Sequence, residues 1–104
     1  MDELMNYQFL HTLESIIASR TTDATDTSYT SKLMASGLDR ILKKIGEESG
    51  EVIIAGKNQD AEEIKNETSD LVFHLLVFLR QQGLSFQDIV DHLEKRHQAR
   101  QSPS

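Results

Sequence analysis

The fold of this chain is decided by residues 61–82, which read AEEIKNETSDLVFHLLVFLRQQ. Apolar residues recur along one face at helical spacing, and from Leu71 onward they occupy the other faces as well. A helix that is apolar on all sides is buried on all sides. Because a single small bundle has few elements to cover such a helix, we expect part of it to pack against a second copy of the chain.

The sequence on both sides of this helix has the same periodicity, interrupted by polar or glycine-containing turns. We expect helices over residues 3–20, 30–36, 38–56, 61–82 and 86–97. Their apolar faces comprise Phe9, Leu10, Leu13, Ile16 and Ile17; Leu38, Ile41, Leu42, Ile45, Val52 and Ile53; and Phe86, Ile89, Val90 and Leu93. The predicted fold is an all-α bundle of four to five helices that pairs as a dimer. One domain covers residues 1–97, and residues 98–104 form a flexible tail.

Two capping boxes set the starts of the last two predicted helices. Asp60 with Glu63, and Ser85 with Asp88, have the spacing at which a side chain at the helix start and one at the third helical position satisfy backbone N–H groups. We therefore expect a tight turn before residue 61, which makes the two long helices an antiparallel hairpin.

The composition excludes several classes of function. A chain of 104 residues without cysteine has neither disulfides nor thiolate metal sites, and we expect it in the reducing cytoplasm. It lacks the pattern of a signal peptide and any apolar run long enough to span a bilayer. A net charge of −6 argues against nucleic acid and anionic membranes as partners. A nucleotide remains possible, because a metal ion can bridge acidic side chains to phosphate.

Two pairs of carboxylates border the apolar faces of the two long predicted helices. Glu48 with Glu51, and Glu67 with Asp70, have the i, i+3 spacing that places both members on one helix face. Both pairs lie at a similar distance from the turn, so an antiparallel hairpin brings them level. Converging carboxylates need a cation or must take up protons. Oxygen ligands from facing helices suit Mg²⁺, and Glu47 is placed to join them as a ligand or a base.

Other interpretations of these residues stay open. The carboxylates can form an ordinary solvated face, since the chain has 17 acidic residues. A di-iron site needs Glu-x-x-His spacing, which these helices lack. His74 stands one turn after Asp70, and it is either a hydrogen-bond partner of that carboxylate or a buried core residue.

Several side chains in the same half of the chain are candidates for binding a substrate. Lys32, Lys44 and Lys57 can neutralise phosphate oxygens, although surface ion pairing is the simpler explanation for any one of them. Tyr29, in the polar segment before residue 30, is either a substrate contact or an aromatic ring packed over the core. No P-loop or dinucleotide-binding glycine motif is present in the sequence.

The acidic pattern Glu47-Glu48-x-x-Glu51 followed by Glu67-x-x-Asp70 resembles the MazG-like all-α nucleotide pyrophosphohydrolases. Three segments narrow the likeness to the phosphoribosyl-ATP pyrophosphohydrolase family: SYTSKL at 28–33, KIGEE at 44–48 and DLVFHLLV at 70–77. The resemblance extends from the first helix to about residue 97. Phe73 stands where the family often has tyrosine, and Ser49 where it often has alanine, and neither difference removes a ligand.

The resemblance implies the second step of histidine biosynthesis, in which phosphoribosyl-ATP and water give phosphoribosyl-AMP and pyrophosphate. It implies a homodimeric helical bundle. In some organisms this domain follows a cyclohydrolase domain, which we do not expect here because Met1 lies just before the first predicted helix. We hypothesise that Glu48, Glu51, Glu67 and Asp70 hold Mg²⁺ and that Glu47 or Glu48 acts on the attacking water. Two alternatives remain: a housekeeping hydrolase of free (deoxy)nucleoside triphosphates, and a non-enzymatic helical interaction module with an acidic rim.

Overall fold

The structure is a computed structural model that describes residues 7–101. This part of the chain consists of five helices and contains no strand. The helices are α2 (Gln8–Thr22), α3 (Tyr29–Ser36), α4 (Leu38–Asn58), α5 (Ala61–Gln81) and α6 (Phe86–Gln101). The predicted all-α fold is confirmed, while positions 3–6 of the first predicted helix lie outside the described residues. No described helix is both long and apolar enough to cross a membrane.

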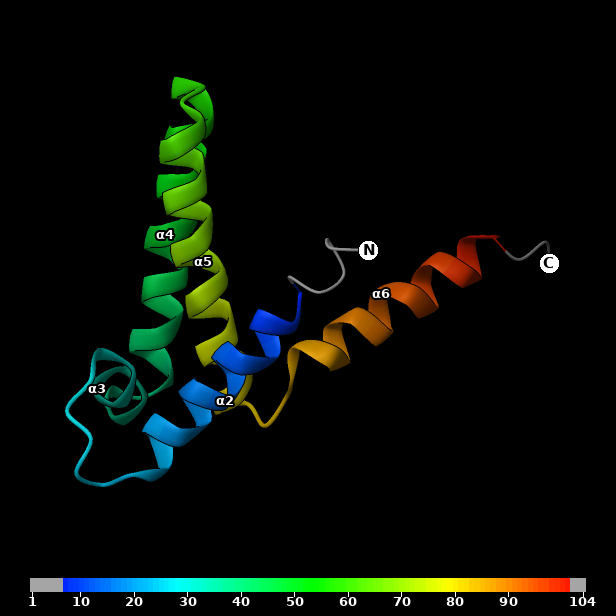
Figure 1. The fold of residues 1–104 in the computed structure, drawn as a ribbon. Helices are drawn as coiled ribbons and strands as arrows, with labels where there is room; N and C mark the ends of the chain where they lie inside the picture. The colour runs from blue at the N-terminus through cyan, green and yellow to red at the C-terminus, as the bar shows by residue number, and fades with distance from the viewer. Residues whose placement is uncertain (1–6, 102–104) are drawn as a thin grey trace.

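Helices α4 and α5 form a long hairpin against which α2 and α3 pack (Figure 1). Gln59 adopts a left-handed conformation with φ of 54°, which ends α4 and reverses the chain. The Asp60 carboxylate accepts hydrogen bonds from the backbone N–H groups of Glu62 and Glu63 at 3.0 and 3.2 Å, which starts α5 as predicted. The other half of the predicted capping box is wrong, because the Glu63 side chain accepts a hydrogen bond from Asn58 instead. Both sides of the turn are thus fixed, and with them the register of the hairpin.

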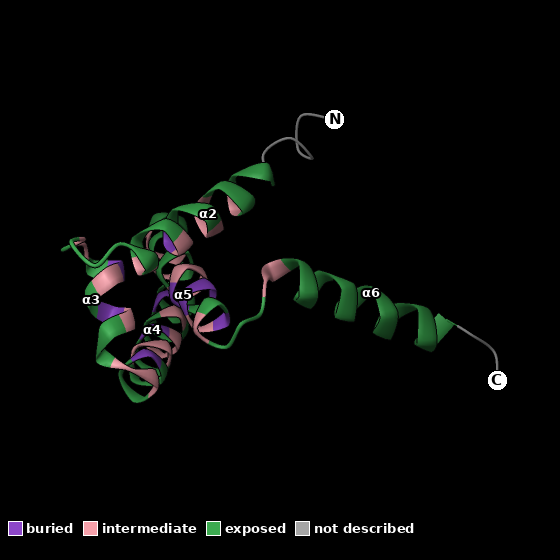
Figure 2. Cartoon of the chain, turned by 90° about the horizontal axis from the view of Figure 1, so that it is seen from below, coloured by how far each residue is buried: buried purple, intermediate pink, exposed green. Residues whose placement is uncertain are grey.

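The core lies where α2 and α3 cover the hairpin (Figure 2). Its buried members come from four helices: Ile17, Leu33, Ile41, Leu76 and Val77. The all-apolar part of α5 is covered in part within the single chain: Leu76, Val77 and Leu79 are buried, whereas Leu75 stays 39% exposed. Helices α2, α3 and α4 supply part of the cover, and the packing of the remaining apolar surface of α5 against a second copy stays a prediction.

Helix α6 leaves the bundle and points away from it (Figures 1 and 2). Its predicted capping box is confirmed: the Ser85 hydroxyl accepts a hydrogen bond from the Asp88 N–H at 3.2 Å, and the Asp88 carboxylate accepts one from the Ser85 N–H at 2.9 Å. None of the residues of α6 is buried. The helix continues to Gln101, into the segment where we expected a tail, and the division at residue 98 stays a prediction.

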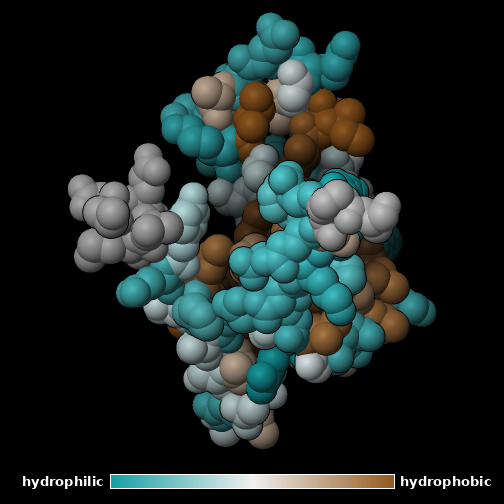
Figure 3. All heavy atoms as spheres, turned by 90° about the vertical axis from the view of Figure 1, so that its right-hand side faces the viewer, coloured by the Kyte–Doolittle hydropathy of each residue, from teal (hydrophilic) through white to brown (hydrophobic). Residues whose placement is uncertain are grey.

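Several apolar side chains that were predicted to be buried are exposed in the single chain. Ile53 on α4 is 67% exposed, Phe9 on α2 is 60% exposed and Leu93 on α6 is 57% exposed. Others share this property: Ile16, Leu42, Ile89 and Val90. Figure 3 shows hydrophobic residues gathered at the surface on the upper part of the α4–α5 hairpin. Periodicity identified the apolar faces, but a face is buried only where another element covers it.

Candidate metal centre

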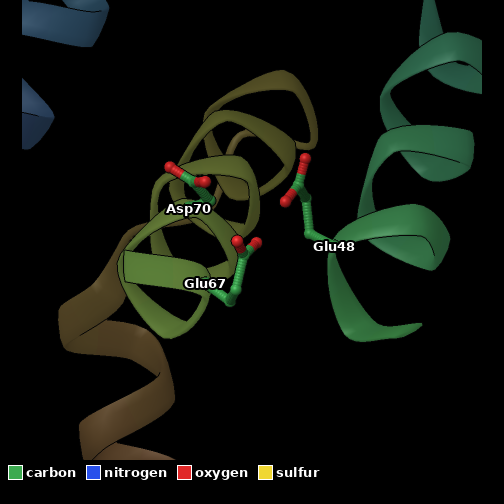
Figure 4. Close-up of side chains that lie close together, drawn as sticks. All are labelled: Glu48, Glu67 and Asp70. Carbon is green, nitrogen blue, oxygen red and sulfur yellow. The ribbon is translucent and has the colours of Figure 1, made fainter. Parts of the chain in front are cut away.

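Three carboxylates from α4 and α5 meet in the hairpin (Figure 4). One oxygen from each of Glu48, Glu67 and Asp70 lies within 4.8 Å of the other two. Glu48 points from α4 toward α5, where Glu67 and Asp70 share a face because they are three residues apart. The hairpin register therefore brings together three of the four predicted ligands, which we call the acidic group.

Two oxygens of the acidic group are buried and lack a hydrogen-bond partner. Glu48 is only 7% exposed, and neither its Oε2 nor the Oε2 of Glu67 meets a donor among the described residues. A buried acceptor left unpaired costs about 1–3 kcal/mol, and more when it is charged. A cation would satisfy both oxygens at once, and a donor set of carboxylate oxygens alone suits a hard divalent ion. The residues present thus fit a metal ion.

Glu51, the fourth predicted ligand, stands at the edge of the acidic group and is exposed. The pKa of Glu51 is raised, first by a hydrogen bond shared with Glu67 and then by the charge of Glu67, although a hydrogen bond with Glu48 acts in the opposite direction. Neighbouring carboxyls resist losing both protons because their negative charges repel. Glu51 is therefore a neighbour of the group whose carboxyl holds its proton more tightly than usual because of Glu67.

Lys44 brings positive charge to the acidic group from the preceding turn of α4. Its Nζ lies 3.5 Å from Oε1 of both Glu47 and Glu48. Burial acts to lower the pKa of Lys44, but the net shift is upward because Tyr29, Glu47 and Glu48 favour the charged ammonium. Glu47 is about half exposed and is held by Lys44, outside the group of close carboxylates.

The other two predicted phosphate-binding lysines form no ion pair with the acidic group. Lys32 on α3 and Lys57 at the end of α4 are exposed, and neither forms an ion pair within residues 7–101. At a rise of 1.5 Å per residue, Lys57 lies about 14 Å along α4 from Glu48. Of the three lysines, Lys44 is the one that the fold brings to the carboxylates.

A hydrogen bond between Tyr29 and His74 ties the start of α3 to α5 near the acidic group. Tyr29 Oη lies 2.8 Å from His74 Nε2, and His74 Nδ1 lies 2.7 Å from the backbone oxygen of Asp70. His74 is buried, as one of our two interpretations predicted, and it contacts the backbone of Asp70 in place of the carboxylate. The ring of Phe73 packs against both partners. Sequence reasoning missed this pair because its members are 45 residues apart, and a histidine within an apolar run was its main signal.

Most of the chain matches proteins of one family. The family model for phosphoribosyl-ATP pyrophosphohydrolase matches residues 10–97. A phosphoribosyl-ATP pyrophosphatase of Leptospira biflexa is 49% identical over 90 residues, which make up 86% of this chain and 98% of that protein. One of Limosilactobacillus fermentum is 47% identical over 89 residues, or 86% of this chain and 84% of that protein. A histidine biosynthesis bifunctional protein of Bacillus subtilis is 50% identical over 91 residues, which cover 88% of this chain but 44% of that protein. The chain therefore spans about half the length of the bifunctional relatives that it matches.

Proposed function

This chain belongs to the phosphoribosyl-ATP pyrophosphohydrolase family, and we propose that it hydrolyses phosphoribosyl-ATP to phosphoribosyl-AMP and pyrophosphate. This reaction is the second step of histidine biosynthesis, and we place it in the cytoplasm. Water supplies the new oxygen as the α–β phosphoanhydride bond breaks. The observation that carries the proposal is the pair of buried, unpaired oxygens of Glu48 and Glu67. A triphosphate is itself anionic, so it can approach these oxygens only with a cation between them.

We assign the cation as Mg²⁺, with Glu48, Glu67 and Asp70 as its protein ligands and Glu51 joining them in its ionised form. Mg²⁺ prefers oxygen ligands and is commonly shared between carboxylates and substrate phosphates. When bound, it would offset phosphate charge and make a coordinated water more acidic. Because protons compete with the cation for the same carboxylates, the affinity for Mg²⁺ should fall as the pH is lowered.

The remaining side chains are assigned roles from their positions. Glu47 is better placed than Glu48 to take a proton from the attacking water, because its carboxylate lies outside the buried group and is held by Lys44 alone. Lys44 is the candidate to neutralise phosphate oxygens as charge moves to the leaving pyrophosphate. Lys57 lies about three turns along α4 from Glu48 and would contact a part of the substrate remote from the bond that breaks. Lys32 on α3 is a further candidate for binding phosphate.

We also propose that the chain functions as a homodimer. In the single chain, apolar residues of α6, including Val90 and Leu93, are exposed. A groove of ≈ 500 Å³ between α2 and α6 is lined largely by apolar side chains, among them Leu10, Phe86 and Val90. Apolar surface of this extent marks interaction sites, and a second copy offers a surface that is complementary by symmetry.

The proposed activity is tested by measuring pyrophosphate release from phosphoribosyl-ATP and from a panel of nucleoside triphosphates, with and without Mg²⁺. We expect turnover of phosphoribosyl-ATP only, and only with Mg²⁺. Glu48→Gln and Glu67→Gln should reduce release to background and should remove any Mg²⁺-induced rise in melting temperature. Glu62→Gln, which alters an exposed carboxylate paired with Lys65, should leave both unchanged.

Each contrary result has a distinct meaning. If Glu48→Gln and Glu67→Gln both hydrolysed phosphoribosyl-ATP as fast as the wild-type protein, the assignment of Glu48 and Glu67 as metal ligands would be contradicted. Equal turnover of free nucleoside triphosphates would favour the housekeeping hydrolase. No turnover of any nucleotide would favour a helical interaction module.

A further inference from the structure

His74 is buried and polar, and the proposed chemistry does not use it. We propose that His74 is a positioning residue that accepts a hydrogen bond from the hydroxyl of Tyr29. The hydroxyl hydrogen is then occupied, and Tyr29 offers only the lone pairs of its oxygen to the substrate. The inference rests on the proposed function, because it names the kind of substrate group that Tyr29 can bind. It assigns Tyr29 to a hydrogen-bond donor of the substrate, such as a sugar hydroxyl, and excludes it as a donor to phosphate.

The hydrogen positions follow from the partners of the imidazole. The backbone oxygen of Asp70 can only accept, so the His74 Nδ1 that lies 2.7 Å from it carries a hydrogen. In a neutral imidazole the other nitrogen then accepts, and the Tyr29 hydroxyl 2.8 Å away is the donor. A phenol has one hydroxyl hydrogen. Once it is given to His74, only the lone pairs of Oη remain for another group.

The two residues joined by this hydrogen bond differ in their exposure to solvent. His74 is 5% exposed, whereas Tyr29 is 50% exposed. The imidazole is therefore the buried end of the contact, and Tyr29 is the half-exposed end, linked through His74 to the backbone of Asp70. Tyr29 is also near enough to Lys44 to favour its charged form. A substrate whose phosphates meet Lys44 would thus place its sugar or base close to Tyr29.

The backbone before Tyr29 is held in place, which makes it suited to a positioning role. The Asp26 carboxylate accepts a hydrogen bond from the Ser28 N–H at 2.7 Å and lies 3.6 Å from the guanidinium of Arg20. The Ser28 hydroxyl accepts one from the Ser31 N–H at 3.2 Å and caps α3. Tyr29 follows directly as the first residue of α3. Its backbone and its hydroxyl are therefore both fixed.

Phosphate oxygens cannot donate a hydrogen bond, whereas sugar hydroxyls and base amino groups can. Phosphoribosyl-ATP carries one more ribose than a free nucleoside triphosphate, and so it has more hydroxyl donors. A fixed acceptor at Tyr29 would select for such groups, because an acceptor that the bound substrate shields from water is costly when it is left unpaired. Tyr29 would then bind hydrogen-bond donors of the substrate, and Lys44 would bind its phosphate groups.

Three variants separate this role from a general packing role of His74. Tyr29→Phe removes the hydroxyl and keeps the ring. His74→Asn keeps a polar group near the position of Nδ1 but not near Nε2, whereas His74→Gln places an amide near Nε2 and can still accept from Tyr29. Folding of each variant is checked by circular dichroism and thermal unfolding.

We expect Tyr29→Phe and His74→Asn each to raise KM for phosphoribosyl-ATP about 3- to 10-fold, the range for one hydrogen bond, with little change in kcat. The double variant should be no worse than either single variant, because both act through one contact. His74→Gln should recover most of the affinity. Additive losses in the double variant, or a His74→Gln variant as impaired as His74→Asn, would overturn the proposal.

The tautomer of His74 gives a readout that needs no turnover. Long-range ¹H–¹⁵N correlation spectra of the wild-type protein should show a hydrogen on Nδ1 and none on Nε2. A hydrogen on Nε2, alone or together with one on Nδ1, would overturn the inference by itself. Absence of phosphoribosyl-ATP hydrolysis by the wild-type protein would instead overturn the proposed function. The two failures are therefore distinguishable.

Discussion

Lys44 serves two purposes in an acidic site that would otherwise be unstable. It pairs with the buried Glu48 and the half-exposed Glu47, which offsets part of the cost of burying negative charge. The same ammonium is the cation nearest to where phosphates would bind. The side chain that stabilises the metal-free protein is thus also the one proposed to meet the substrate.

Replacing Lys44 by Met should lower the free energy of unfolding by about 1 kcal/mol at neutral pH, because Glu48 loses its only close cation among the described residues. The pKa of Lys44 is raised in the folded state, so its contribution is fully present below the ordinary value of 10.5 and is lost as the pH rises through the folded value. Urea unfolding at several pH values measures this. Lys43→Met, at an exposed position, is the control, and an equal effect of both substitutions would contradict the role of Lys44.

The acidic group could be predicted from sequence because its members are ordered by local rules. The spacing of Glu67 and Asp70 set their shared face, and the cap at Asp60 set the register that brings Glu48 level with them. The contact between Tyr29 and His74 follows no local rule, because it depends on how α3 packs on the hairpin. Lys57 was grouped with the site by nearness in sequence, but the length of α4 keeps it away from the carboxylates.

The segment between α2 and α3 is ordered by side chains that bond to the backbone. Asp26 has its pKa lowered, first by the hydrogen bond of the Ser28 side chain, then by that of the Ser28 backbone, and also by the charge of Arg20. A carboxylate with a lowered pKa stabilises the folded state above its ordinary pKa of 3.8 and loses this effect as the pH falls through the folded value. The start of α3 should therefore loosen in acid.

Asp26→Ala should destabilise the protein at neutral pH, and the difference from the wild type should shrink below about pH 3.8 as Asp26 becomes protonated. Asp26→Asn keeps an acceptor for the Ser28 N–H, so its effect should be smaller. Urea unfolding at neutral and acid pH measures both, with Thr27→Ala at an exposed neighbouring position as the control. A difference that persists unchanged in acid would show that the charge of Asp26 is not responsible.

The positions of the helices could be predicted from the sequence, but which of their apolar faces are buried by other helices could not. Turn residues and periodicity located the helices described within residues 7–101, with most bounds within two residues of those predicted. The exceptions are the start of α2 at Gln8 and the end of α6 at Gln101. Ile53 and Leu93 have the spacing of core residues, yet α4 and α6 have no element over those faces in one chain. Whether a helix face is buried depends on which other elements pack against it, and the periodicity of one helix carries no information about them.

In the chain as a whole, α6 is the element whose position a single copy explains least. It starts from the bundle, where the Glu14 carboxylate accepts a hydrogen bond from the Phe86 N–H at 2.8 Å, and then extends into solvent. A helix in this position contributes little to the stability of one chain. Its exposed apolar residues are the natural contact for the proposed second copy.

Leu93→Asp should convert the proposed dimer to a monomer, because a charge placed in an apolar interface leaves an unpaired ion there. Light scattering after size-exclusion chromatography measures the mass over a range of concentrations. Gln98→Asp adds the same charge on another side of α6 and should leave the dimer intact. A monomeric wild-type protein, or a dimeric Leu93→Asp variant, would contradict the proposed interface.

Because the acidic group is built within one hairpin, it also bears on how the chain folds. Glu48 and Asp70 are close in sequence, so the short turn at Gln59 brings them together at a small cost in loop-closure entropy. Local contacts of this kind form early. In that step the carboxylates approach one another before any substrate is present, and their repulsion opposes it. Refolding should therefore be slower in low salt without divalent ions than in their presence, so that the residues that build the binding site would also slow the formation of the native hairpin.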